Sequence, residues 1–157
     1  RNFSHARNKF SKEIIFSNNV WLLRPPPNEF TQWLTGFAGE EFGLVHKLYE
    51  WYKVFHVDVT TFPKTERHTL GEAIKTRILI LIEGVWEANT LPLPERLRLL
   101  ERLQRVLDLI KILVRLVYDV GIYKMPIYLV RQQQLQEIGR MLGSWRKTTR
   151  KKLGIDP

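Results

Sequence analysis

From Leu44 onward, apolar residues recur at helical spacing, and prolines and glycines divide this pattern into segments. Leu44, Leu48, Trp51 and Phe55 stand at i, i+4, i+7 and i+11, which is one stripe of a helix. We expect this first helix to end before Pro63, because the residue that precedes a proline disfavours helical geometry.

A second helix is predicted from Thr69 to about Asn89. Thr69 and Glu72 match a capping box, in which each side chain satisfies an exposed backbone donor of the other residue. The residues expected to face the core share one side of this helix: Leu70, Ile74, Ile78, Leu81, Ile82 and Val85.

The third helix has Pro94 in its first turn, runs to about Val120 and stops at Gly121, a residue suited to a left-handed cap. A connection through Pro126 leads to the fourth helix, which continues to Lys152. Short connections between four helices predict an all-α, up-down-up-down bundle over residues 44–153.

The third helix is apolar around more than one face. Beyond a core stripe of Leu97, Leu100, Leu107, Val114 and Val117, a second apolar set widens the pattern: Leu99, Leu103, Val106, Ile110 and Leu113. Such a helix is buried on several sides, so we expect this second set to form an interface between subunits. Coverage by the amino-terminal extension remains the alternative.

Residues 1–43 differ in composition from the rest and are interpreted as an amino-terminal extension. They are rich in Asn, Ser and Phe and contain the run Pro25 to Pro27. Whether this extension is ordered, and whether it is native, stays open at this point. The chain begins with Arg rather than Met, so a processed product, a fragment and an over-extended reading frame all remain possible.

Composition narrows the classes of partner. The 157 residues carry 25 Lys and Arg against 16 Asp and Glu, a formal net charge of +9, which favours nucleic acid, acidic proteins or anionic surfaces. The absence of cysteine excludes disulfides and thiolate sites and suits a cytoplasmic protein. No apolar run reaches the about 18 residues of a membrane span, so we expect no membrane contact.

The last helix combines two features, small residues beside an apolar face and a dense positive charge. Gly139 and Gly143 are interpreted, with Gly71, as packing glycines that let another backbone approach. The cations are candidates for contacts with several phosphates at once: Arg140, Arg146, Lys147, Arg150, Lys151 and Lys152. The competing interpretation is a solvated helix end whose cations meet the helix dipole favourably.

Further cations have weaker assignments. A second basic set, for which ordinary exposure is the favoured interpretation, comprises Lys64, Arg67, Lys75, Arg77 and Arg131. Within this set, Lys75, Arg77 and Arg131 are further candidates for contacts with the phosphates of a nucleic acid. Four arginines are expected to make either intrahelical or intersubunit pairs with Glu101, Asp108 or neighbouring acids: Arg98, Arg102, Arg105 and Arg115. Glu101 and Arg105 stand in favourable i, i+4 order.

No catalytic or metal site is expected. His5, His46, His56 and His68 lack metal-ligand spacing, and no nucleophile stands beside a base. The sequence therefore predicts a protein that is not an enzyme and that requires no cofactor.

Three stretches resemble the accessory variability determinant (Avd) proteins of diversity-generating retroelements. They are LYEWYK (48–53), FPKTERHTLGEAI (62–74) and EIGRMLGSW (137–145), and the resemblance covers residues 44–152. A second group, the four-helix proteins encoded in ribosomal RNA intervening sequences, shares the proline-anchored turn but usually has a more acidic last helix.

The resemblance implies a non-catalytic four-helix protomer that assembles into a homopentamer. It also implies binding to a reverse transcriptase and to RNA and DNA, namely template RNA and cDNA, in support of mutagenic copying and retrohoming. The alternative is a helical protein-interaction module of the intervening-sequence type, without a reverse transcriptase partner.

Overall fold

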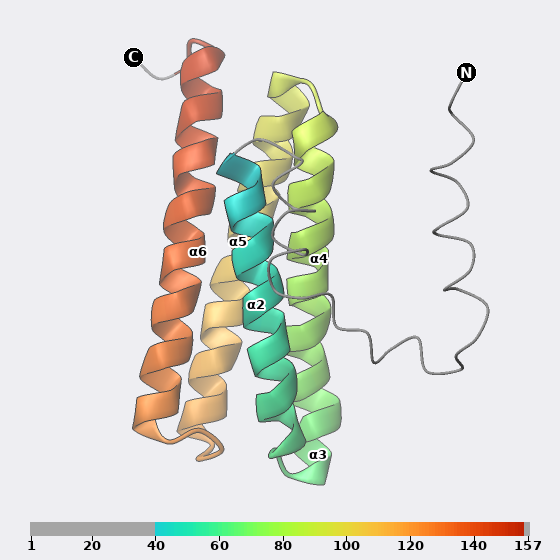
Figure 1. Ribbon diagram of the computed structural model, residues 1–157, viewed down its shortest axis with the longest axis vertical. Helices are drawn as coiled ribbons and strands as arrows, with labels where there is room; N and C mark the ends of the chain where they lie inside the picture. The colour runs from blue at the N-terminus through green and yellow to red at the C-terminus, as the bar shows by residue number, and fades with distance from the viewer. Residues whose placement is uncertain (1–39, 156–157) are drawn as a thin grey trace, which may run out of the picture. The chain divides into compact units, whose positions relative to one another are not determined.

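The computed structural model describes residues 40–155, and in this range the chain consists of helices and short turns. Four long helices follow one another: α2 (Glu40–Thr60), α4 (Glu72–Thr90), α5 (Leu93–Asp119) and α6 (Met125–Lys152). Successive long helices run antiparallel (Figure 1), so the expected all-α, up-down-up-down bundle is confirmed. The extension predicted over residues 1–43 lies almost entirely outside the described residues.

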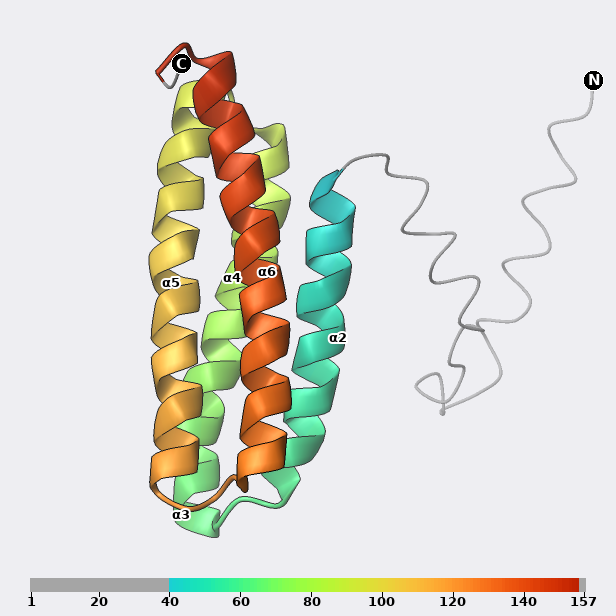
Figure 2. The same ribbon diagram turned by 90° about the vertical axis from the view of Figure 1, so that its left-hand side faces the viewer.

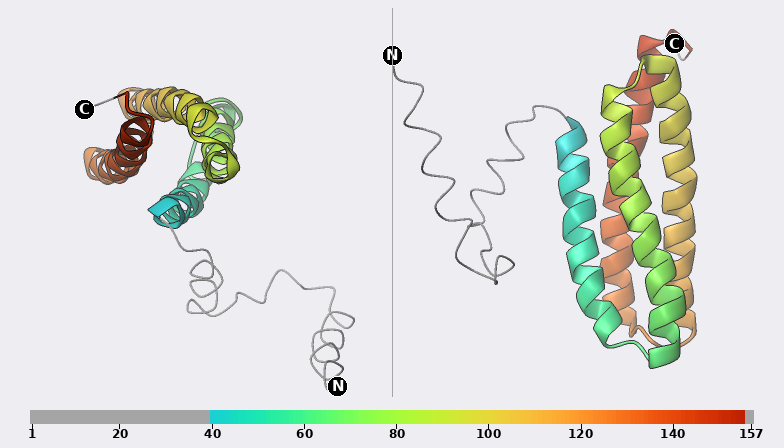
Figure 3. Two further views of the ribbon diagram at one scale, coloured as in Figure 1. Left: turned by 90° about the horizontal axis from the view of Figure 1, so that it is seen from above. Right: turned by 90° about the vertical axis from the view of Figure 1, so that its right-hand side faces the viewer.

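The long helices surround a single core in the order α2, α4, α5, α6 when seen along the bundle (Figure 3). Packing is most extensive between α5 and α6 and between α4 and α5, and less extensive between α2 and α6. One end of the bundle holds the start of α5 and the end of α6, whereas the opposite end holds the turn that joins them (Figure 2). None of the helices in residues 40–155 has the length and apolar character that crossing a membrane requires.

The predicted core stripes are confirmed. Leu44, Leu48, Trp51 and Phe55 of α2 are all buried, and α5 buries every residue of its expected core stripe. On α4 the stripe is narrower than predicted, because Leu70 and Ile82 are only half-buried against the core.

The expected start of the second helix at Thr69 is wrong. Pro63 has extended geometry, with φ −51° and ψ 145°, and the helical segment begins directly after it as α3 (Lys64–Glu66). A π-helical turn, η2 (Arg67–Gly71), then continues into α4. Thr69 lies inside this segment, and its hydroxyl donates to the Thr65 carbonyl at 3.2 Å instead of capping a helix start. Proline geometry, not the capping box, therefore sets the start.

Gly139 and Gly143 have different roles from those expected, whereas Gly71 is closely packed, since a Cβ there would lie 3.0 Å from Val59 Cγ1. A Cβ on Gly143 would meet no atom within 4 Å, so its assignment as a packing glycine is wrong for the described residues. A Cβ on Gly139 would meet the Lys111 side chain at 3.1 Å rather than another backbone. The closest packing occurs at Gly84 of α4, where a Cβ would lie 2.5 Å from Leu103 Cδ2. Gly121 has φ +80° after α5, which confirms the predicted left-handed cap.

Candidate nucleic-acid interface

The last three turns of α6 carry the densest group of cations. Leu142, Trp145 and Thr149 turn toward the core, and the Thr149 hydroxyl donates to the Trp145 carbonyl at 2.9 Å. This places the intervening positions at the surface, where Arg140, Lys147 and Lys151 are exposed on the outer side of the helix. Helical geometry thus sorts this amphipathic segment into an apolar inner side and a cationic outer side.

Most of these cations are not neutralised by carboxylates. Among the side chains that the structure describes, those of residues 43–155, no acidic partner contacts Arg140, Arg146, Lys147, Lys151 or Lys152. Arg150 differs, because its guanidinium Nη2 lies 2.8 Å from Glu101 Oε1 of α5. Arg150, Lys151 and Lys152 also lie in the last turn, where positive charge meets the helix dipole favourably.

The other predicted phosphate contacts lie apart from this group. Lys75 pairs with Glu72 at 3.1 Å, and Arg77 donates to the Ala73 carbonyl at 2.7 Å. Both residues belong to the first half of α4, at the end of the bundle opposite the carboxyl end of α6. Arg131 lies near the start of α6, at that same opposite end. The structure therefore does not bring Lys75, Arg77 and Arg131 together with the cations of the last turns.

Arg131 belongs to a buried cluster instead. Its Nε donates to Asp58 Oδ2 at 2.7 Å and its Nη2 donates to Asp58 Oδ1 at 3.0 Å. The Tyr123 hydroxyl donates to the same Oδ2 at 2.7 Å. The side chains of Arg131 and Asp58 are only 12% and 15% exposed. This cluster joins the end of α2 to the start of α6 and to the turn before it.

The cluster shifts the titration of two members. Burial, followed by the hydrogen bond to Asp58, raises the pKa of Tyr123 well above its ordinary value. The hydrogen bond to Asp58 raises the pKa of Arg131, so its guanidinium stays charged. A cation committed to a bidentate internal salt bridge is a poor candidate for phosphate binding.

One arginine of α5 behaves as predicted and the others do not, because Arg115 pairs with Asp119 at 2.8 Å. Glu101 pairs with Arg150 of α6, so the expected pair between Glu101 and Arg105 is wrong. Asp108 accepts hydrogen bonds from Gln104 and Lys111. Three exposed arginines on α5 consequently have no carboxylate partner among the side chains described for residues 43–155: Arg98, Arg102 and Arg105.

The second apolar set on α5 contains some residues that lie inside the core of the bundle and others that lie at the edge of the core. Leu103 and Ile110 are fully buried inside the bundle, and burial within one chain accounts for them without a neighbouring subunit. Leu99, Val106 and Leu113 are half-buried against the core. A different apolar stripe faces outward on the second half of the helix, comprising Leu109, Ile112, Leu116 and Val120. This stripe lies on the same side of α5 as the three exposed arginines, because its residues continue their spacing of three and four positions: Leu109, Ile112 and Leu116.

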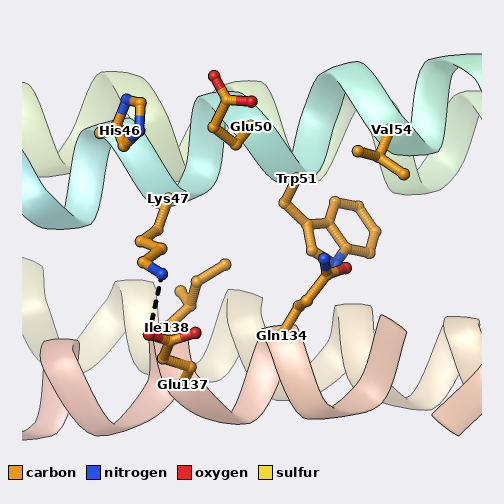
Figure 4. Close-up of a pocket in the computed structure, with 8 residues that line it drawn as sticks. All are labelled: His46, Lys47, Glu50, Trp51, Val54, Gln134, Glu137 and Ile138. Atoms are coloured by element: carbon orange, nitrogen blue, oxygen red, sulfur yellow. Dashed lines mark ion pairs between the residues drawn. The ribbon is translucent and has the colours of Figure 1, made fainter. Parts of the chain in front are cut away.

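A cavity of about 270 Å³ lies between α2 and α6 (Figure 4). Its lining includes His46, Trp51 and Gln134, and the ion pair between Lys47 and Glu137, at 3.0 Å, spans it. Within residues 40–155, no group of three or more His, Cys, Asp or Glu side chains is arranged to hold a metal ion. The cavity therefore offers no arrangement of groups with evident chemistry.

Comparison with known proteins identifies the family. A family model described as bAvd-like matches residues 43–149, which include all of α4 and α5 and most of α2 and α6. No match was found among curated proteins, and none was found among solved structures. The family consists of non-catalytic accessory proteins, and membership implies an accessory protein of a diversity-generating retroelement. On this match over most of its length, the chain belongs to the bAvd-like family.

Proposed function

We propose that this chain is a basic, oligomeric scaffold that binds nucleic acid together with a reverse transcriptase. In this role it supports mutagenic synthesis of cDNA on a template RNA and the return of that cDNA to a target gene. The protein contributes charge and geometry rather than catalysis. Its cations offset the repulsion between phosphates and thereby allow a structured RNA and a polymerase to be held together.

The observation that carries this proposal is the group of unneutralised cations on the last turns of α6. Arg140, Arg146, Lys147, Lys151 and Lys152 lack carboxylate partners among the described side chains of residues 43–155. A polyanion is the ligand class that gains most from such a surface, because each neutralised phosphate releases condensed counterions. Family membership and the formal net charge of +9 agree with the same ligand class.

A salt series tests the binding step. We expect the protein to bind a fluorescent structured RNA and to lose affinity steeply as salt rises from about 50 to 200 mM. For four to five phosphate contacts the slope of log K against log salt is about −4. Fluorescence anisotropy measures this slope directly. Absence of binding at 50 mM salt would remove the nucleic-acid role and would favour a helical protein-interaction module with a different partner.

Self-association is a second part of the proposal, and a pentamer is the state that the resemblance implies. The outward stripe of α5 supports it, since Leu109, Ile112, Leu116 and Val120 are each 39% exposed or more. From Leu109 to Leu116 this stripe follows spacings of three and four residues, the pattern by which helices pack on one another. The half-buried Leu113 flanks the stripe and extends the apolar area.

A pair of matched substitutions tests the interface. Ile112 is 64% exposed on the stripe, and Val57 is 63% exposed on α2, away from it. We expect Ile112→Lys to convert the oligomer to a monomer, because an ammonium group is costly to bury between two apolar faces. Val57→Lys should leave the assembly intact. Multi-angle light scattering measures both masses, and an Ile112→Lys protein of unchanged mass would contradict an interface on this stripe.

The reverse transcriptase partner rests on family membership rather than on a particular contact. A gene for a reverse transcriptase and a template repeat beside the coding sequence would support it. Co-purification of the two proteins, tested in the presence of nuclease, separates a direct contact from one bridged by RNA. Loss of the polymerase after nuclease treatment would contradict a direct contact.

A further inference from the structure

A second row of cations lies on α5 beside the cations of α6. Arg98, Arg102 and Arg105 occur at i, i+4 and i+7 and therefore share one side of the helix. All three side chains are exposed, and none meets a carboxylate in the part of the chain that the structure describes. On α6, Arg140, Lys147 and Lys151 occur at i, i+7 and i+11 and form a corresponding exposed row.

The two rows lie at the same end of the bundle. The first half of α5 and the second half of α6 run antiparallel and side by side (Figure 2). The ion pair between Glu101 of α5 and Arg150 of α6, at 2.8 Å, joins the two half-helices at this end of the bundle. With a rise of about 1.5 Å per residue, the α5 row is about 10 Å long and the α6 row about 16 Å. Packed helix axes lie about 8–10 Å apart, so the two backbones that carry the rows are held at that spacing.

The surface of these two half-helices offers charge without aromatic rings. The segments 93–106 and 139–152 contain one aromatic residue, Trp145, and its side chain is buried in the core. The exposed Tyr49 and Trp86 belong to α2 and α4 instead. Gly143 contributes no side chain on α6, and the space that its Cβ would fill is open. A ligand is therefore able to come close to the α6 backbone beside the cationic row.

We propose that Arg98, Arg102 and Arg105 complete a two-row surface, with Arg140, Lys147 and Lys151, that holds the two phosphate strands of a double-stranded nucleic acid. This inference rests on the proposed function and specifies its ligand. Surfaces for single strands combine one charged track with aromatic rings on which bases stack, and these half-helices present no such ring. Two rows on rigid helices at a fixed separation instead match a duplex, whose paired strands hold their phosphates at fixed separation.

Neutralising the α5 row tests the inference. The variant Arg98→Gln/Arg105→Gln removes two exposed cations from that row, and Lys64→Gln/Lys124→Gln removes two exposed cations from the opposite end of the bundle. The four side chains have no acidic partner within residues 40–155, so we expect both variants to fold as the parent protein does. Circular dichroism and thermal melting check this point.

The probes are a 20-base-pair RNA duplex, a DNA duplex of the same sequence and one RNA strand alone, each followed by fluorescence anisotropy over a salt series. We expect at least one of the duplexes to bind about tenfold more tightly than the single strand. The α5 variant should weaken duplex binding about tenfold or more and reduce the salt slope by about 2, because two phosphate contacts are lost. The Lys64 and Lys124 control should change duplex affinity less than twofold.

The possible results are distinguishable. Equal duplex affinity for the α5 variant and its control overturns the two-row surface but leaves binding through α6 in place. Single-strand binding as tight as duplex binding overturns the choice of ligand. Loss of every nucleic-acid interaction in the parent protein is a failure of the proposed function itself. Tighter binding of the RNA or of the DNA duplex identifies which duplex the surface prefers.

Discussion

Replacing Lys147 and Lys151 by glutamate should weaken nucleic-acid binding by about two orders of magnitude while leaving the bundle folded. Both lysines are exposed on the outer side of α6, and neither contacts a carboxylate of residues 43–155, whose side chains the structure describes. At about 0.1 M salt, each phosphate contact contributes a factor of about eight through counterion release. Two lost contacts account for a factor of about 60, and repulsion between the new carboxylates and phosphate increases it further.

The control variant carries the same change at the other end of the bundle. Lys64 and Lys124 are also exposed lysines without acidic partners in the described part of the chain. Lys64→Glu/Lys124→Glu and Lys147→Glu/Lys151→Glu each lower the formal net charge of +9 by four units. A general effect of net charge would therefore weaken binding equally in both variants. Anisotropy at 100 mM salt measures the difference, and equal losses would refute a localised site on α6.

The largest effect on stability is expected at Arg131. Its replacement by Met should lower the free energy of unfolding by about 3 kcal/mol or more, because it leaves the buried Asp58 carboxylate without its cation. In a domain of this size such a loss corresponds to a fall in Tm of about 10 °C. Urea unfolding followed by circular dichroism measures the free energy, and the midpoint should shift without a change in slope.

Lys47→Met is the matched control for Arg131→Met. Lys47 and Glu137 also join α2 to α6, but their side chains are 45% and 42% exposed. Exposed pairs contribute about 0–1 kcal/mol, so we expect a small change. Equal destabilisation by the two substitutions would contradict a special role for the buried cluster.

The pH dependence of this cluster has a defined sign. The pKa of Tyr123 is raised in the folded state, so its contribution to stability is complete below the ordinary tyrosine pKa of about 10 and is lost at higher pH. Tyr123→Phe should abolish the part of the stability loss at alkaline pH that comes from ionisation of Tyr123. The comparison between Arg131→Met and its control is therefore best made near pH 7, where Tyr123 stays protonated.

The helices were predictable because they depend on local periodicity. The stripe of Leu44, Leu48, Trp51 and Phe55 is buried as its spacing indicated. The start of the second helical segment was predicted wrongly because two local signals compete there. Pro63 lacks an amide hydrogen and suits a helix start, and this signal prevailed over the capping box at Thr69.

The pairing of charges was less predictable, because partners come from distant parts of the chain. Spacing favoured Glu101 with Arg105, but Glu101 instead contacts Arg150, which lies 49 positions away. Likewise, Arg131 looked like an ordinary surface cation until Asp58 of α2 was placed beside it. Knowing which arginines remain without carboxylates required the tertiary arrangement, and this arrangement led to the second cationic row on α5.

The outer side of α5 changes from arginine to apolar residues within a few positions, and this division makes the helix a rigid spacer. Arg102 and Ile112 are ten residues apart, which corresponds to about 15 Å along the axis. That length exceeds the screening distance of about 8 Å at physiological salt. A protein seated at Ile112 and Leu116 would thus lie beyond the strongest field of a polyanion held at Arg98 and Arg102, whereas the boundary between Arg105 and Leu109, four residues or about 6 Å along the axis, lies within that distance.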